Sequence, residues 1–472
     1  MPGEGLEANL ENRLPASLPI GTTTAVFLAG TCFHRGERIV RLELVVGGAR
    51  HRAAAFGMPR PDVFDAWRVP GSFRSGFWGT VTVEARGRVE ISVAARLADG
   101  RELTAPLGAI EAAEPEPTPR SGRRRPSGLI AICMATHEPD KERLRAQIES
   151  LRAQTDPDWV CVISDDHSSP DRFAAIEAAA AGDERITLSR ASRRRGFYGN
   201  FERALRMAPA EAELLALCDQ DDLWHRDKLA ALRVALGDAQ LVYSDQRLVA
   251  PDARVLRGTL WSGRRNNHSD IASLLVANTV TGAAAMLRRS VLELALPFPD
   301  APGVAFHDHW LALVALASGT IAYVDRPLYD YVQHPGAVFG DVGRGRRPRP
   351  WRAARGAYFL GYLGRDVMAR TLLARCAGTL GPAKRRALER FLAAPDSPAA
   401  LAWLTARPLR ALWGRNETLG SELDLVRGIL WRRLVPLLAI GARRPGRRPL
   451  DARFPDDDSF RQRRLERWRA RS

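Results

Sequence analysis

Long apolar runs are missing from this sequence. The uncharged run at residues 271–287 contains Ser273, Asn278 and Thr281, so it is too short and too polar for a transmembrane helix. Residues 1–18 contain acidic side chains and no apolar core, which is not the pattern of a secretory signal peptide. We therefore expect a cytoplasmic protein, and any membrane contact should be peripheral, on the inner face of the membrane.

Cysteine is also scarce. The five cysteines form no CxxC pair, and three of them lie in apolar, strand-like runs. They are Cys32, Cys133, Cys161, Cys218 and Cys376. This pattern predicts reduced core residues rather than disulfides or a thiolate metal site.

Acidic residues are outnumbered by basic ones. The chain has 70 Lys and Arg against 54 Asp and Glu, a net charge of +16 that is almost all arginine. Such a balance favours anionic partners such as nucleotide phosphates or an acidic membrane surface. No recognition motif for nucleic acid accompanies the charge, so we expect no nucleic-acid partner. At 472 residues the chain is too long for one core.

The composition divides the chain into five parts. Residues 1–110 alternate apolar and polar side chains, as at Val40, Leu42 and Leu44, which predicts a β-sandwich-like domain. Residues 111–127 are a Pro- and Arg-rich linker, residues 128–340 an α/β catalytic domain, residues 341–440 a helical region and residues 441–472 a basic tail. Trp67, Phe77 and Trp78 are expected either to stack on a sugar ring or to belong to the core.

The central part alternates strand and helix patterns. Continuous apolar runs at 129–135, 159–163 and 214–218 predict buried parallel strands. Helices are predicted from residue 139, over 171–181, and over 201–207 after a turn at 196–200. Because parallel strands end at one edge of a sheet, their polar ends should meet there.

One strand end carries the acidic cluster Asp219-Gln220-Asp221-Asp222. Three carboxylates in four residues repel one another unless a positive charge lies among them. Hard oxygen ligands of this kind suit Mg²⁺ or Mn²⁺. The alternative is a solvated acidic turn that caps the helix predicted from about residue 226.

Several motifs occur together in this region. In chain order they are Thr136-His137-Glu138, Asp165-Asp166, the acidic cluster, His307-Asp308-His309-Trp310 and Gln333-His334. With these five motifs, residues 129–340 resemble glycosyltransferase family 2, the inverting enzymes of the GT-A fold, and within it the rhamnosyltransferase-like branch of cell-envelope polysaccharide synthesis. The resemblance implies a metal-dependent hexosyltransferase with a mostly parallel, Rossmann-like sheet.

The resemblance also implies roles for single residues. Thr136, Glu138, Asp166, Gly196, Asn200 and Asp219 would lie against the nucleotide sugar. Asp219 and Asp221 would bind the metal, joined by His334, and Asp308 would be the general base. The donor would be a UDP- or dTDP-sugar and the acceptor a saccharide or a lipid-linked saccharide. The sequence departs from the family pattern at His137 and Glu138, and at Arg195 before the glycine, which leaves the base and ribose contacts open.

Two other functions remain alternatives. A nucleotidyltransferase on a similar sheet would need a Gly-rich phosphate loop with a lysine near the first strand, and residues 134–141 lack one. A non-catalytic scaffold could bind carbohydrate through the N-terminal domain, but it would not need Asp219, Asp221 and Asp308.

The C-terminal part suggests a membrane contact. Leu423, Val426, Leu430 and Leu434 lie on one stripe of a predicted helix, and residues 441–472 contain eleven Arg against five acidic residues. This combination is typical of docking on anionic lipid, but an ordinary packed helix followed by a solvated tail fits equally well.

Overall fold

The computed structural model describes residues 5–15, 17–19, 23–84, 87–113, 128–261, 267–301, 306–333, 354–413, 419–438 and 451–455. The predicted linker from residue 114, most of the predicted basic tail and His334 lie outside these ranges. No helix within them combines the length and apolarity that crossing a bilayer requires.

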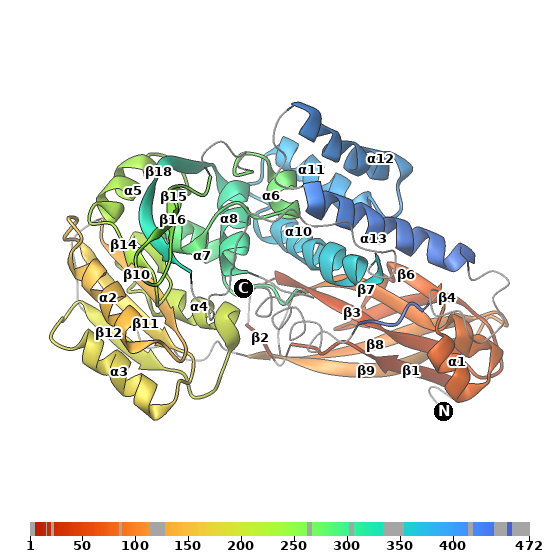
Figure 1. Cartoon of the computed structure of the whole chain (residues 1–472). Coiled ribbons are helices and arrows are strands. Elements are labelled where there is room, and N and C mark those ends of the chain that lie inside the picture. The colour runs from red at the N-terminus through yellow and green to blue at the C-terminus, as the bar shows by residue number, and fades with distance from the viewer. Residues whose placement is uncertain are drawn as a thin grey trace.

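The N-terminal part consists of two β-sheets (Figure 1). The first has the order β1 (Leu6–Leu10), β3 (Thr23–His34), β7 (Gly76–Glu84), β6 (Ala55–Met58), and the second β2 (Ser17–Pro19), β9 (Glu102–Ala113), β8 (Gly87–Leu97), β4 (Ile39–Val46), β5 (Ala49–Arg52). Strand β9 runs past the predicted boundary at residue 110. The sequence pattern also missed two short helices, α1 (Pro61–Trp67) and η1 (Pro70–Arg74).

Strand β3 shows how the first sheet packs on both faces. Val26 and Leu28 belong to the core between the two sheets, whereas Phe27 and Ala29 belong to the core shared with the rest of the chain. Side chains alternate in this way because successive residues of a strand point to opposite faces. Trp78 is 1% exposed and lies in the shared core, so it is a packing residue and not a sugar platform.

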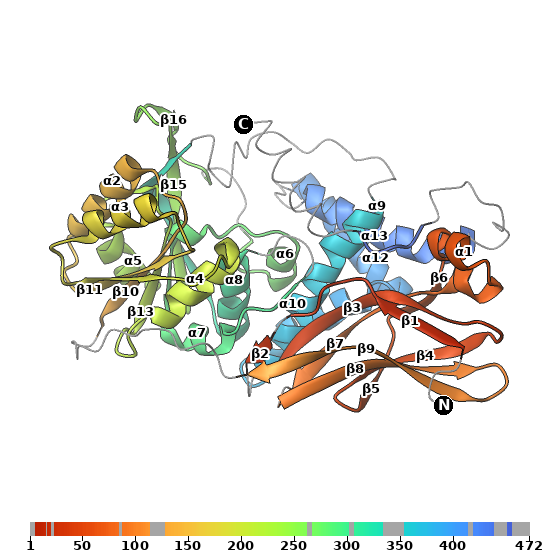
Figure 2. The same cartoon turned by 90° about the horizontal axis from the view of Figure 1, so that it is seen from below.

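The central part is a mixed α/β unit built on one large sheet (Figure 2). Its strands are β12 (Ile186–Arg190), β11 (Trp159–Asp165), β10 (Ile130–Thr136), β13 (Leu214–Cys218), β17 (Ala285–Arg288), β15 (Leu241–Val249), β18 (Ile321–Val332) and β14 (Leu223–Trp224), with β16 (Val255–Arg257) paired to β15. Strands β12, β11, β10 and β13 are mutually parallel, and β17 is antiparallel to both neighbours. This mostly parallel α/β architecture confirms the predicted GT-A-like fold class.

Helices cover the large sheet. They are α2 (Lys141–Arg152), α3 (Pro170–Ala180), α4 (Gly196–Met207), α5 (Lys228–Leu236), α6 (Ile271–Val276), η2 (Gly282–Ala284), α7 (Arg289–Ala295) and α8 (His307–Ser318). Helix α2 begins after Asp140, whose carboxylate accepts the Arg143 N–H at 3.1 Å, and it buries Leu144, Ile148 and Leu151. Every residue of β11 and β13 is buried, because helices pack on both faces of a parallel sheet.

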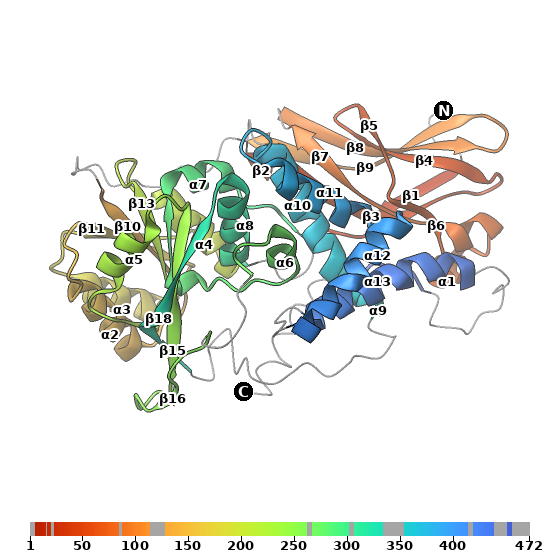
Figure 3. The same ribbon diagram turned by 90° about the horizontal axis from the view of Figure 1, so that it is seen from above.

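The last part is helical and joins the other two (Figure 3). It contains α9 (Ala354–Gly356), the π-helical turn η4 (Ala357–Tyr362), α10 (Leu363–Arg375), α11 (Pro382–Ala393), α12 (Pro398–Ala406), η5 (Arg407–Trp413) and α13 (Leu419–Leu438). Helix α10 contacts β3 and β7 on one side and α8 on another. Trp78 Nε1 donates to the Tyr358 hydroxyl at 3.1 Å, so the N-terminal sheet and the helical part share a buried aromatic core.

Candidate active site

The ends of β10 and β11 are tied together by polar side chains. Thr136 and Asp165 are paired in register, and the Thr136 hydroxyl donates to Asp165 Oδ1 at 3.2 Å. The backbone N–H of Ser168 donates to Asp165 Oδ2 at 3.0 Å. Thr136 and Asp165 are both buried. The first acid of the Asp165-Asp166 pair is therefore structural, and Thr136 orients it.

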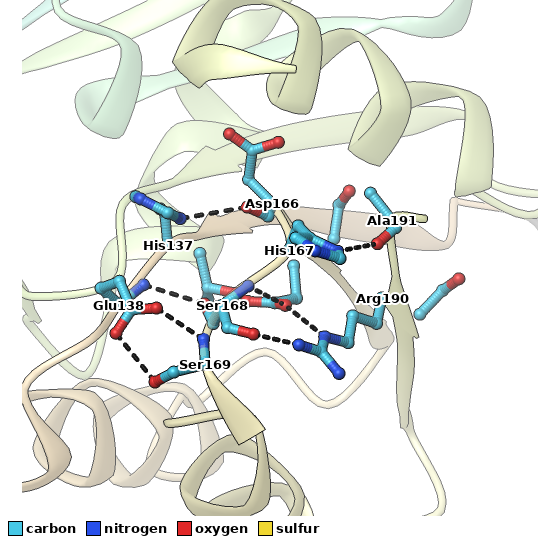
Figure 4. A network of polar contacts seen from close by, with 12 residues as sticks. His137, Glu138, Asp166, His167, Ser168, Ser169, Arg190 and Ala191 are labelled. Carbon is cyan, nitrogen blue, oxygen red and sulfur yellow. Dashed lines mark hydrogen bonds and ion pairs between the residues drawn. The ribbon is translucent and has the colours of Figure 1, made fainter. Parts of the chain in front are cut away.

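Asp166 holds the start of α4. Its Oδ1 accepts the Arg195 N–H at 2.5 Å and its Oδ2 accepts the Gly196 N–H at 2.9 Å. Gly196 has a φ of +74°, in the left-handed region that glycine adopts without strain. In Figure 4 the Asp166 carboxylate points away from the contact between Glu138 and Ser169. Asp166 thus fixes the loop that leads into α4.

Asn200 lies inside α4, because the helix begins at Gly196 and not, as the sequence pattern suggested, at residue 201. Its Nδ2 donates to the Thr136 carbonyl at 3.1 Å and to the Ser164 carbonyl at 2.9 Å, and its Oδ1 accepts the Ser164 hydroxyl at 2.6 Å. Both amide hydrogens are therefore used within the protein, and Asn200 joins α4 to the ends of β10 and β11.

Glu138 contacts the start of α3. Its Oε1 accepts the Ser169 N–H at 2.5 Å and its Oε2 accepts the Ser169 hydroxyl at 3.0 Å. The Ser169 N–H and hydroxyl hold the pKa of Glu138 below its usual value. Glu138 and His167 have φ values of 44° and 59°, a strained backbone that in non-glycine residues often marks a functional loop.

The side chain of Gln220 connects these loops to the acidic cluster by hydrogen bonds to the backbone of His137. Gln220 Oε1 accepts the His137 N–H at 2.8 Å, and Gln220 Nε2 donates to the His137 carbonyl at 3.2 Å. His137 Nδ1 lies 3.0 Å from the Asp166 carbonyl oxygen. The residue between the two acids of the motif therefore fastens the acidic loop beside the end of β10.

The acidic cluster is crowded and poorly compensated. Burial, together with Asp221 and Asp308, raises the pKa of Asp219 to about 7. Asp222 is 1% exposed, and neither of its carboxylate oxygens has a hydrogen-bond partner of normal geometry among the described residues. Burial raises the pKa of Asp222, and the nearby Val332 N–H counters part of this rise. These carboxylates would be stabilised by a further positive charge.

Lys228 is the cation that the protein places beside them. It is fully buried in α5, and its ammonium group donates to the Ala283 carbonyl and lies 3.5 Å from the centre of the Trp224 ring. Burial lowers the pKa of Lys228 to about 7, while Cys218, Asp222 and Asp219 act in the opposite direction. One lysine cannot balance several carboxylates.

Asp308 lies in the first turn of α8. Its Oδ1 accepts the His309 N–H at 2.6 Å and its Oδ2 accepts the Gly282 N–H at 3.1 Å. Burial raises the pKa of Asp308 to about 6, and these N–H groups with the Asn278 amide limit the rise. Because Asp308 also raises the pKa of Asp219, the structure brings the two acids close although 89 positions separate them in the sequence.

The histidines on either side of Asp308 point elsewhere. His307 stacks on Phe201 with ring centres 3.6 Å apart, and His309 Nε2 lies 2.6 Å from the Leu274 carbonyl oxygen. Burial lowers the pKa of His307 to about 3 and that of His309 to about 4. Both imidazoles are neutral near pH 7, so they do not depress the pKa of Asp308.

The carboxylates fit a divalent cation by their chemistry. The orphaned oxygens of buried Asp222 and the raised pKa of Asp219 indicate missing positive charge. Among the described residues no three His, Cys, Asp or Glu side chains form a ready metal site, and His334 lies outside those residues. Mg²⁺ is commonly held by one or two carboxylates, with phosphate oxygens and water completing its shell, so Asp219 and Asp221 suffice in number.

Comparison with known proteins agrees with this arrangement. Residues 131–295 match the family described as glycosyl transferase family 2. This stretch of the chain is similar to the family 2 glycosyltransferases, and the match covers the strands β10 to β17 of the large sheet apart from the ends. No curated protein sequence matched significantly.

Two solved structures are similar to the chain at low identity. TarS residues 1–349 of S. aureus in complex with UDP-GlcNAc is 11% identical, with 66% of this chain and 92% of that chain covered and a TM-score of 0.40. The mannosyltransferase PcManGT of Pyrobaculum calidifontis, in complex with GDP-Man and Mn²⁺, is 18% identical, with 75% and 88% covered and a TM-score of 0.38. At these TM-scores neither likeness carries an argument about activity.

Three residues near the site were given no role of their own from the sequence. They are Asp222, Lys228 and Gly282. Lys228 is the first residue of α5 and follows Arg226 and Asp227, so nothing in this charged stretch of sequence signals that its side chain is buried. At Gly282 a Cβ would lie 2.7 Å from His307 Nε2 and 3.3 Å from Asp308 Cβ. Glycine therefore allows the loop to approach Asp308.

Proposed function

We propose that the chain is an inverting hexosyltransferase that moves a sugar from a UDP- or dTDP-linked donor to a saccharide or lipid-linked saccharide. The similarity to family 2 glycosyltransferases supports the reaction class. The observation that carries the proposal is the buried acidic cluster at the end of β13, with Asp308 near enough to raise the pKa of Asp219 and held by two backbone N–H groups. We place the reaction in cell-envelope polysaccharide synthesis, in the cytoplasm or on the inner face of the membrane.

The proposed division of the chain follows the sequence. Residues 128–340 would form the catalytic domain, residues 1–110 an N-terminal β-domain, and residues 341–440 a helical region, with 111–127 as the linker and 441–472 as a basic tail. Because Trp78 and Tyr358 share a core, we propose that the β-domain supports the catalytic domain mechanically rather than acting as a separate carbohydrate-binding module.

In the proposed reaction Asp308 takes the proton of the attacking acceptor hydroxyl. A carboxylate does this best when its pKa lies near the working pH, and the pKa of Asp308, raised to about 6, meets this condition. Proton transfer to Asp308 accompanies attack on the anomeric carbon, and the bond to the diphosphate breaks on the opposite face. A single displacement of this kind inverts the anomeric centre.

The remaining residues would position the donor. Asp166, through the Arg195 and Gly196 N–H groups, would hold the α4 loop against the nucleotide, and Asn200, Thr136 and Glu138 would act through the loops that they fasten. Asp219 and Asp221 would hold Mg²⁺ or Mn²⁺, with His334 as a further ligand. When bound, such a cation supplies charge stabilisation to the leaving diphosphate.

The test is a screen of nucleotide sugars for hydrolysis, with UDP- and dTDP-sugars first. We expect release of the nucleoside diphosphate that depends on Mg²⁺ or Mn²⁺, stops in EDTA and is lost in Asp221→Ala. Asp252→Ala, which removes an exposed acid elsewhere, is the matched control. Full activity in EDTA would remove the metal assignment, and release of pyrophosphate from nucleoside triphosphates would instead favour a nucleotidyltransferase.

A further inference from the structure

Helix α13 has one face packed and one face exposed. Leu425, Ile429 and Val435 are buried. The exposed leucines of this helix are Leu423 at 53%, Leu430 at 36%, Leu434 at 40%, Leu437 at 61% and Leu438 at 57%. At 3.6 residues per turn these five side chains fall within an arc of about 100° and extend over about 22 Å. We call them the leucine face of α13.

The packed side fixes the direction in which the leucine face points. Gly428 lies against the backbone of Tyr358, where a Cβ would come within 2.6 Å of the Tyr358 nitrogen. Trp431 packs on Phe359 with ring centres 5.8 Å apart, and Arg433 Nε donates to the Pro395 carbonyl at 2.8 Å. Rotating α13 to bury its leucines would break all these contacts, so the leucine face stays on the outside.

Leu409 of η5 is also an exposed apolar side chain of the helical part, at 53%. Isolated exposed leucines are ordinary on protein surfaces, whereas a row of them along one helix marks an interaction site. Their presence argues for a partner that covers the leucine face.

Charge decides which partner fits. The chain carries a net charge of +16, and a net charge far from zero disfavours the association of two copies. Residues 441–472, which follow α13 closely, contain eleven Arg against five Asp and Glu. An anionic bilayer would accept the apolar side chains at the headgroup boundary and attract the arginines at the same time.

We propose that the leucine face of α13 docks this chain on an anionic lipid surface. The five leucines enter the interfacial layer, and the arginines that follow in the sequence contribute the electrostatic attraction. The inference rests on the proposed function in one respect, since the lipid surface is where the enzyme would meet a lipid-linked acceptor. The docking itself is measured without substrate.

The experiment is flotation of the full chain with phosphatidylglycerol–phosphatidylcholine vesicles and with pure phosphatidylcholine vesicles. The double variant Leu430→Ser/Leu434→Ser should bind the anionic vesicles about tenfold more weakly, since two apolar side chains are lost from the contact. Binding of the unmodified chain should fall as salt rises. Val234→Ser changes an apolar residue of α5 that is 83% exposed and should bind like the unmodified chain.

Three results would overturn the docking. One is unchanged binding by the double variant, and another is equal binding to neutral vesicles. The third is a dimer in light scattering that the double variant dissociates, because the face would then belong to a second copy. Circular dichroism on each variant verifies folding. A chain that floats without hydrolysing any donor refutes the proposed function alone, and hydrolysis without flotation refutes the docking alone.

Discussion

Asp308 combines two properties that a general base needs. The Gly282 and His309 N–H groups hold its carboxylate in one orientation, and burial raises its pKa to about 6. The carboxylate is therefore ionised at neutral pH and still basic enough to accept a proton. The neutral histidines beside it, whose pKa values burial lowers to about 3 and about 4, add no charge that would reverse this.

The pKa of Asp308 predicts how the transfer rate falls at acidic pH. A general base works only when deprotonated, so the transfer rate at saturating donor should be constant at neutral pH and fall as pH drops through about 6. The measurement is a pH–rate profile with the metal concentration held saturating at each pH. A rate that stays constant well below pH 6 would exclude Asp308 as the base.

Removing the proton acceptor should separate binding from chemistry. Asp308→Asn keeps the shape of the side chain, so donor affinity should stay near that of the unmodified chain, while transfer falls by about 10²–10⁴-fold. Calorimetry and rate measurements on one preparation test both. Loss of donor binding together with loss of thermal stability would instead show that Asp308 has a structural role.

At the scale of elements, three cations of the helical part each meet the end of a helix in the α/β unit. Arg365 Nη2 donates to the Val276 carbonyl at the end of α6 at 2.6 Å, and Arg375 Nη1 donates to the Ala295 carbonyl at the end of α7 at 3.0 Å. Lys384 Nζ donates to the Leu316 and Gly319 carbonyls at the end of α8, at 2.6 and 2.7 Å. Cations at helix C-termini satisfy the last carbonyls and stabilise the helix dipole.

Lys384 is therefore expected to stabilise α8, the helix that carries Asp308. Lys384→Met keeps much of the apolar stem and removes both hydrogen bonds, which should lower the free energy of unfolding by about 1–2 kcal/mol. Urea unfolding measures this difference. Arg386→Met on the exposed side of the same helix is the control, and an equal effect of the two substitutions would contradict a specific role for Lys384.

Continuous apolar runs made the parallel strands predictable. The apolar run at residues 214–218 predicted a strand buried on both faces, and β13 has the same bounds and is buried throughout. The start of α4 was harder to predict from the sequence. The Gly196 N–H is held there by the carboxylate of Asp166, which lies 30 positions earlier in the chain. The partners of Asn200 and Glu138 likewise come from other loops, and sequence periodicity does not encode such contacts.

At the scale of the whole molecule, the first β-sheet, the helical part and the catalytic part share one core. Trp78 packs on Phe359 with ring centres 5.0 Å apart, and Phe454, from the short segment 451–455, lies 5.6 Å from Phe27 and 5.4 Å from Phe359. Composition had suggested separate domains along the chain. The aromatic contacts between distant segments could not be predicted from it, because the same residues would also fit an isolated sandwich core.

A shared core predicts that the two parts unfold together. Trp78→Ala would leave a cavity next to Tyr358 and Phe359, and replacing a buried aromatic residue in this way costs about 3–5 kcal/mol. Because that cavity lies in the core that joins the first sheet, the helical part and the catalytic part, calorimetry should show one transition that moves to lower temperature, with loss of donor hydrolysis at the same temperature. Trp78→Phe, which keeps an aromatic ring in the core but loses part of the indole volume and the hydrogen bond to Tyr358, should shift it less. Two separate transitions, with only the lower one sensitive to Trp78, would mean that the N-terminal sheets fold independently of the catalytic part.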